Sequence, residues 1–267
     1  MPEHEGALWI AGRQLAATPD PAHLVICQAA RAVVSKRPVG CDQTNIFQQL
    51  PSTLDSHIAM LRAHPRSAQV LAEAGEPRLV NIQQVCAAQP TIHVEDAIAR
   101  VGHLDPGDLV GLAQVTLPLH VPVQLPYMFD HTKNAWILSS PNPNLRIAGP
   151  FTAEVQPGSN GFGFIVEIAR SYLQVAGVGG RYFLRDGYHR SYGILAAGIT
   201  WAPALVREYA TIEEANMPAG LLSPSTYLGE RPPTLRDYLD AAVSAETSVP
   251  VTTKIVVVQA IDLSSLT

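Results

Sequence analysis

The segment that most constrains the fold is residues 181–198, which read RYFLRDGYHRSYGILAAG. Aromatic and aliphatic residues from Tyr182 to Leu184 form a strand pattern, and Asp186-Gly187, a dipeptide typical of turns, follows closely. The apolar run that comes next contains no proline and ends at Gly198, a residue type that commonly terminates a helix. The pattern therefore predicts a strand, a tight turn and a short helix.

The start of this predicted helix carries the groups of an anion site. The first turn of a helix leaves backbone N–H groups unpaired and holds the positive end of the helix dipole, so it stabilises a phosphate or a carboxylate. Arg190 adds a planar donor fork, His189 a donor that titrates near neutral pH, and Ser191 a hydroxyl. The structural alternative is that Asp186 caps the turn, Gly187 satisfies a backbone angle, and His189 and Arg190 point into water.

The motif continues beyond the helix, because Asp186-Gly187-x-His189-Arg190 is followed by the Gly198 turn and by a strand entered through a Pro-Ala step at residues 203–204. Over residues 182–206 this order resembles the ParB/sulfiredoxin-like superfamily. The resemblance implies an α+β fold, with a mixed sheet and helices, elaborated here by a helical N-terminal region. It also implies nucleotide binding, with phosphate contacts from Gly187, Tyr188, His189, Arg190 and Ser191 and from the backbone after Gly187.

The resemblance leaves the activity open. Partition proteins of the superfamily bind and hydrolyse CTP, sulfiredoxins use ATP to repair an oxidised cysteine in a partner, and some relatives phosphorylate free serine. Sulfiredoxins carry a reactive cysteine immediately before the His-Arg pair, where this chain has Tyr188, which cannot perform that sulfur chemistry. Partition proteins continue into a helix-turn-helix DNA-binding domain, whereas the residues after Pro203 are rich in proline and acidic residues.

The leading hypothesis is a nucleotide- or phosphate-binding protein of this superfamily that acts as a nucleotide-dependent phosphotransferase or NTPase on a small molecule. ATP or CTP with Mg²⁺ is the expected cofactor, and no metal site made by the protein alone is expected. His189 would orient or protonate a phosphate oxygen, and Asp186 is either a metal-facing carboxylate or only a turn cap. Arg146, in a loop rich in asparagine and proline, is a candidate second phosphate contact.

The second hypothesis, from a different class, is a non-catalytic binding or regulatory protein that retains the fold. It uses the pocket as a sensor, or keeps the motif merely as a structural turn.

A helix is also expected immediately before the Arg181 strand. Residues 162–176 place apolar side chains at helical spacing on one face, and residues 177–180, Gly-Val-Gly-Gly, would end this helix. Glu167 falls on the polar face, where a solvated position competes with a role as general base or magnesium ligand.

The predicted secondary structure divides the chain into a mainly helical region, residues 1–105, and an α+β region with a C-terminal extension, residues 106–267. A single domain fits the pattern as well. Helical patterns cover 24–34, the apolar face of Leu54, Ile58 and Leu61, and a run toward Gly75. Strands are predicted at 110–117 and 121–125, at 127–129 paired with 135–138, and at 254–261, the last buried in the main sheet.

Composition narrows the partners. The 18 lysine and arginine residues against 23 aspartate and glutamate residues give a net charge of -5, which disfavours binding to nucleic acid. No apolar stretch is long enough to span a bilayer, and the N-terminus lacks the basic region of a secretory signal, so a cytoplasmic location without a membrane partner is expected. Three widely spaced cysteines, Cys27, Cys41 and Cys86, read as buried free thiols, and His57 and His64 as exposed helix positions.

Overall fold

The computed structural model describes residues 21–101, 104–120, 124–140, 142, 144–218, 222–246 and 253–259. Its helices and strands confirm the α+β class. The chain forms two compact units: unit 1 consists of residues 1–120 and 171–247, and unit 2 of residues 121–170 and 248–267. These boundaries differ from the division expected near residue 105, between a mainly helical region and an α+β region.

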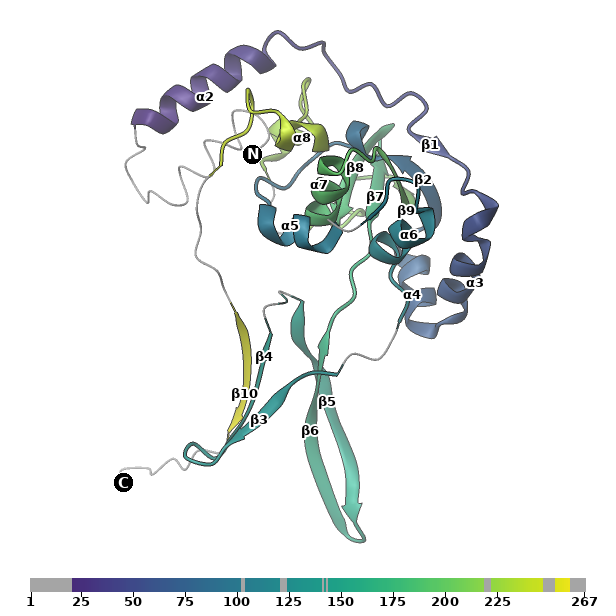
Figure 1. Ribbon diagram of the computed structural model, residues 1–267, viewed down its shortest axis with the longest axis vertical. Coiled ribbons are helices and arrows are strands. Elements are labelled where there is room, and N and C mark those ends of the chain that lie inside the picture. The colour runs from purple at the N-terminus through teal and green to yellow at the C-terminus, as the bar shows by residue number, and fades with distance from the viewer. Residues whose placement is uncertain are drawn as a thin grey trace. The chain divides into compact units, whose positions relative to one another are not determined.

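Unit 1 is built on a five-stranded sheet with the order β1-β2-β9-β7-β8 (Figure 1). Strand β7 runs parallel to β9, and the other neighbouring strands are antiparallel. The strand predicted before Asp186 and the strand containing Pro203 are confirmed as β8 and β9. The strands are β1 Phe47–Gln48, β2 Glu76–Asn81, β7 Gln174–Val178, β8 Arg181–Asp186 and β9 Trp201–Tyr209.

Helices cover both faces of this sheet, as the alternation along β9 shows. Ala204 and Val206 share a buried cluster with residues of α5, α6 and α7, whereas Leu205 between them packs with residues of η1, α3 and α4. The helices are α2 Pro21–Val34, α3 Asp55–Ala63, α4 Pro65–Ala74, α5 Val94–Val101, α6 Leu109–Thr116, α7 Tyr188–Ala196 and α8 Pro224–Tyr227, with short 3-10 helices η1 Ser52–Leu54, η2 Ile82–Gln84 and η3 Leu235–Leu239.

Two secondary-structure predictions are wrong. The run 110–117 is helix α6 rather than a strand, and its cap Asp108 accepts a hydrogen bond from the Gly111 N–H at 2.8 Å. A short continuous apolar run fits a buried helix and a buried strand equally well. Residues 162–176 form most of β6 and the start of β7 rather than a helix, and the glycines after them form a hairpin turn with positive φ at Gly179 and Gly180.

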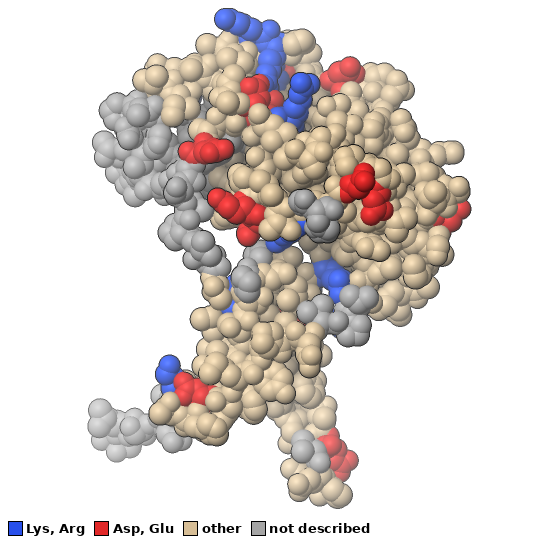
Figure 2. All heavy atoms as spheres, viewed as in Figure 1, with Lys and Arg blue, Asp and Glu red and all other residues tan. Residues whose placement is uncertain are grey.

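Unit 2 consists of two small antiparallel sheets. One has the strand order β10-β4-β3, with β3 Tyr127–Asp130, β4 Ala135–Ser140 and β10 Lys254–Gln259, and it confirms the predicted pairing of 127–129 with 135–138. The other is a hairpin of β5 Leu145–Gln156 and β6 Ser159–Ile168. Figure 2 shows unit 2 as mainly uncharged residues.

The C-terminal strand corrects another expectation. Strand β10 pairs with β4 along its whole length rather than with the main sheet, and Ile255 and Val257 are exposed rather than buried. Residues 260–261 of the predicted strand lie outside the described residues, as do 121–123 of the strand predicted at 121–125, while Gln124 and Leu125 form no strand.

His57 is buried rather than exposed, since its Nε2 lies 2.9 Å from the Leu117 carbonyl oxygen. Among the described residues, no helix combines the length and the apolar character needed to cross a membrane.

Candidate functional site

The predicted turn and helix are present where β8 passes into α7. Gly187 stands between them with φ of 100°, a left-handed conformation that favours glycine. A side chain there would also meet Leu173, because an added Cβ would lie 2.6 Å from its Cδ1. The fold therefore requires glycine at this position, and the first turn of α7 begins directly after it.

The motif then splits into a buried and an accessible half. Tyr188 and Ser191 are buried, and the Tyr188 hydroxyl donates to the Leu184 carbonyl and accepts from the Ala88 N–H. Burial raises the pKa of Tyr188 above its usual value. The side chains of Tyr188 and Ser191 thus belong to the core of unit 1, and a phosphate contact from these two residues stays a prediction.

Arg190 is buried as well, and its guanidinium is used inside the protein. Nη1 donates to the carbonyl oxygens of Val115 at 3.0 Å and Ser171 at 2.7 Å, and Nη2 donates to the Ser171 hydroxyl at 2.8 Å. The predicted donor fork therefore joins α7 to the end of α6 and to the segment before β7. This geometry makes Arg190 a positioning residue rather than a group that points into water. Its Nε is buried and has no hydrogen-bond partner among the described residues, and its contact with phosphate stays a prediction.

The accessible half is His189 with Asp186. The His189 ring is partly exposed and stacks on the ring of His93, with 5.5 Å between the centroids and 10° between the planes. Burial, together with the positive charges of Arg100 and His93, lowers the pKa of His189 to about 4. Burial also raises the pKa of Asp186, against the opposing charges of Arg190, Arg185 and Arg100.

Helix α5 places Arg100 near His189, and His93 is the residue directly before this helix; sequence reasoning missed both. The two helices approach closely at Gly193, where an added Cβ would lie 2.4 Å from the Ala97 carbonyl oxygen. A glycine inside a helical pattern marks such a close approach, so Gly193 was the available signal, although it does not say which helix comes near. Arg100 and His93 flank the segment that packs there.

The other candidate residues lie apart from this group in the chain. Arg146 belongs to unit 2, where it is on β5 and its Nη2 donates to Glu167 Oε1 on β6 at 3.0 Å. Glu167 is thus part of an ion pair on a hairpin and not on the polar face of a helix.

The carboxylates near the start of α7 are the groups that could bind Mg²⁺. Asp186 and Asp96 are carboxylates whose charges act near the start of α7. No group of three or more His, Cys, Asp or Glu residues that could hold a metal ion occurs in the described part of the chain. Protein-bound Mg²⁺ commonly uses only one or two carboxylates together with substrate phosphates. The residues present fit an ion that arrives with a nucleotide, and Asp186 would be its protein ligand.

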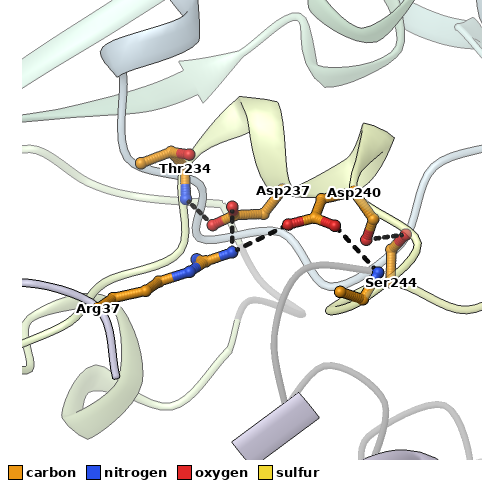
Figure 3. A network of polar contacts seen from close by, with 6 residues as sticks. Arg37, Thr234, Asp237, Asp240 and Ser244 are labelled. Carbon is orange, nitrogen blue, oxygen red and sulfur yellow. Dashed lines mark hydrogen bonds and ion pairs between the residues drawn. The ribbon is translucent and has the colours of Figure 1, made fainter. Parts of the chain in front are cut away.

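A second concave region lies toward the opposite end of β8. A cavity of about 1120 Å³ is lined by residues from the loop after α2, from η2 and from η3, among them Arg37, Cys41, Gln84 and Asp237. One wall is a polar network in which Arg37 Nη2 lies 2.9 Å from Asp237 Oδ1 and 3.4 Å from Asp240 Oδ2 (Figure 3). Asp237 also accepts from the Thr234 N–H at 2.8 Å, so this wall is internally satisfied.

Comparison of the chain with protein-family models, with curated proteins and with solved structures finds no match.

Proposed function

We propose that this chain binds the phosphate groups of a nucleotide, ATP or CTP with Mg²⁺, at the start of α7. The observation that carries the proposal is the position of His189. Its partly exposed ring lies in the first turn of a helix, next to His93, and in the positive field of Arg100. A helix start and nearby cations both stabilise a bound anion. The proposal also rests on the resemblance of residues 182–206 to the ParB/sulfiredoxin-like superfamily.

Each group has a distinct part in this proposal. The neutral His189 ring donates a hydrogen bond to a phosphate oxygen, and backbone N–H groups of the first turn of α7 supply further donors. Arg100 contributes charge, and Arg190 keeps the turn in place through its hydrogen bonds to Val115 and Ser171. Mg²⁺ would neutralise part of the phosphate charge when bound.

In the enzymatic form of the proposal, the chain is a phosphotransferase or NTPase that acts on a small molecule. The neutral His189 ring then orients a phosphate oxygen, and Asp186 would hold Mg²⁺ beside the phosphates when the ion is bound.

The second candidate is a non-catalytic protein that keeps the fold, and a specific observation favours it. Tyr188, Arg190 and Ser191 all have buried side chains, and Nη1 and Nη2 of Arg190 donate to other groups of the chain. A motif that is used this way stabilises a turn whether or not a ligand binds.

Thermal unfolding of the full chain with ATP, CTP or GTP, each with and without Mg²⁺, separates these functions. A nucleotide at 100 times its dissociation constant adds about 2.7 kcal/mol of stability. We expect His189→Ala and Arg100→Ala each to weaken binding at least about tenfold, which corresponds to about 1.4 kcal/mol. No stabilisation of the native protein by any of the three nucleotides would leave the structural turn as the function of the motif.

Arg236→Ala is the matched control. It removes the same charge as Arg100→Ala, but from an exposed residue that lines the cavity beside Arg37. Nucleotide binding should be unchanged in this variant. If Arg236→Ala weakens binding and His189→Ala does not, the nucleotide occupies that cavity and the assignment to α7 is wrong. Release of phosphate from a bound nucleotide, lost in Asp186→Asn, distinguishes the enzyme from a binding protein.

A further inference from the structure

The loop between α2 and β1 is fastened to β8, the edge strand of the main sheet, by one side chain. Gln43 Oε1 accepts from the Tyr182 N–H at 2.9 Å, and its Nε2 donates to the Tyr182 carbonyl at 2.8 Å. The amide of Gln43 thus pairs with the strand as a neighbouring peptide group would. These two bonds fix the position of Cys41, two residues earlier in the loop.

Cys41 is held next to a second thiol, Cys86. Cys41 Sγ donates to the Gln84 carbonyl oxygen at 3.4 Å. The same oxygen accepts a hydrogen bond from Gln43 Nε2 at 3.0 Å. Gln43 Nε2 in turn lies 3.7 Å from Cys86 Sγ, so the same amide nitrogen contacts Cys86 and the carbonyl oxygen that accepts from Cys41. Both cysteines pack in one apolar cluster with Phe183 and Tyr227.

The two thiols differ in access and in acidity. Cys41 is partly exposed and lines the 1120 Å³ cavity, whereas Cys86 is fully buried. The neighbouring Cys86 thiol and the charge of Arg181 lower the pKa of Cys41. The neighbouring Cys41 thiol and burial raise the pKa of Cys86. A reactive cysteine is an accessible one that is readily ionised near positive charge, which describes Cys41.

We propose that Cys41 and Cys86 form a redox-active pair, in which hydrogen peroxide that enters the cavity oxidises Cys41 and Cys86 then closes an intramolecular disulfide. In the first step the Cys41 thiolate attacks one peroxide oxygen. The O–O bond breaks, and the leaving hydroxide takes the electron pair and a proton to become water. Sulfur is oxidised to a sulfenic acid, and the peroxide is reduced.

In the second step the sulfur of Cys86 attacks the sulfur of Cys41. The S–O bond breaks, and the departing hydroxide leaves as water with the proton from the Cys86 thiol. The product ties the loop around Cys41 covalently to the segment between η2 and α5, which contains Cys86. Because that loop also forms part of the cavity wall, oxidation fixes the wall in place. This site is separate from the proposed nucleotide site, so either can fail without the other.

Peptide mapping by mass spectrometry of the full chain, before and after treatment with hydrogen peroxide, tests the proposal. We expect a peptide pair linked through Cys41 and Cys86, while Cys27 on α2 stays reduced. In Cys86→Ser the sulfenic acid on Cys41 persists and is trapped by a cyclic diketone, and in Cys41→Ser the peptide of Cys86 stays unmodified. Cys27→Ser is the matched control and should form the linked pair as the native chain does.

Several results would overturn the proposal: no linked pair in the native chain, oxidation of Cys27 in its place, or a trapped sulfenic acid on Cys86. The mapping of the native chain decides the matter even if a serine variant fails to fold. As a check on positioning, Gln43→Ala should slow closure of the disulfide at least about tenfold without changing the rate at which free Cys41 forms the sulfenic acid in the Cys86→Ser background.

Discussion

The two units of the molecule use similar strand patterns in opposite ways. In unit 1, the aromatic residue Phe183 on β8 is fully buried, in a cluster with residues such as Leu222 and Tyr227. In unit 2, Phe162 on β6 is 68% exposed and Tyr127 on β3 is 69% exposed. Apolar side chains on a strand therefore indicate that the strand exists, but only the elements that cover it decide whether it contributes to a core.

Exposed apolar surface of this extent commonly marks a binding surface, and a two-stranded hairpin alone is marginally stable in water. Within unit 2 the rings of Phe162 and Phe164 pack edge to face with centroids 5.2 Å apart, and on the other face of the hairpin the Phe151 ring lies over its partner Gly163. These contacts shield only part of the rings. Unit 1 should accordingly carry most of the free energy of folding.

Paired phenylalanine substitutions test this difference most strongly. Phe183→Ala removes a fully buried ring and should lower the free energy of unfolding by about 3 to 5 kcal/mol. Phe162→Ala removes an exposed ring and should change it by less than about 0.5 kcal/mol. Denaturant unfolding followed by circular dichroism gives both values. Equal losses in the two variants would show that unit 2 buries Phe162 in solution.

The two arginines predicted to contact phosphate, Arg190 and Arg146, extend the same comparison of the two units. Arg190→Ala leaves the carbonyls of Val115 and Ser171 without their donors inside unit 1, and should lower stability by about 3 kcal/mol. Arg146→Ala breaks an exposed ion pair with Glu167 in unit 2, which is worth about 0.2 to 1 kcal/mol.

Thermal unfolding of both arginine variants without ligand checks this expectation. If Arg190→Ala is as stable as the native protein, these hydrogen bonds contribute little to stability. That result would favour the predicted contact of Arg190 with phosphate.

The parts of the site that the sequence predicts are those set by local chemistry. Asp186-Gly187 fixed the turn because a left-handed residue is needed there, and the proline-free apolar run after it fixed α7. The hydrogen-bond partners of Arg190 could not be predicted, because the carbonyl groups of Val115 and Ser171 belong to other segments of the chain. His93 and Arg100 were missed for the same reason, since their nearness depends on how α5 packs at Gly193.

The wrong element predictions also have a physical cause. Residues 162–168, FGFIVEI, alternate as a strand does, but over a few residues the same apolar positions also fit a helix. The strand at 254–259 was predicted because most of its residues are β-branched. Its pairing with β4 could not be predicted, because the two strands are far apart in the sequence and a local pattern does not specify which strand is the partner.

Acid titration bears on unit 1 alone. The pKa of His189 is about 4 in the folded chain, lowered from 6.5 by burial and by nearby positive charge. Above pH 6.5 neither state holds the proton, so the full stability is present. Between 6.5 and 4 only the unfolded chain gains it, and the free energy of unfolding should fall by up to about 1.4 kcal/mol for each pH unit. Below pH 4 this loss levels off.

Denaturant unfolding at a series of pH values measures the slope, and His189→Gln should flatten it in that window. Adding inorganic phosphate should raise the pKa of His189, because a bound anion favours the charged ring, and proton NMR of the imidazole follows this shift directly. A pKa of His189 that does not move at saturating phosphate or nucleotide would separate the ligand from the start of α7. The motif would then act through its buried half, Tyr188, Arg190 and Ser191, as part of the core of unit 1.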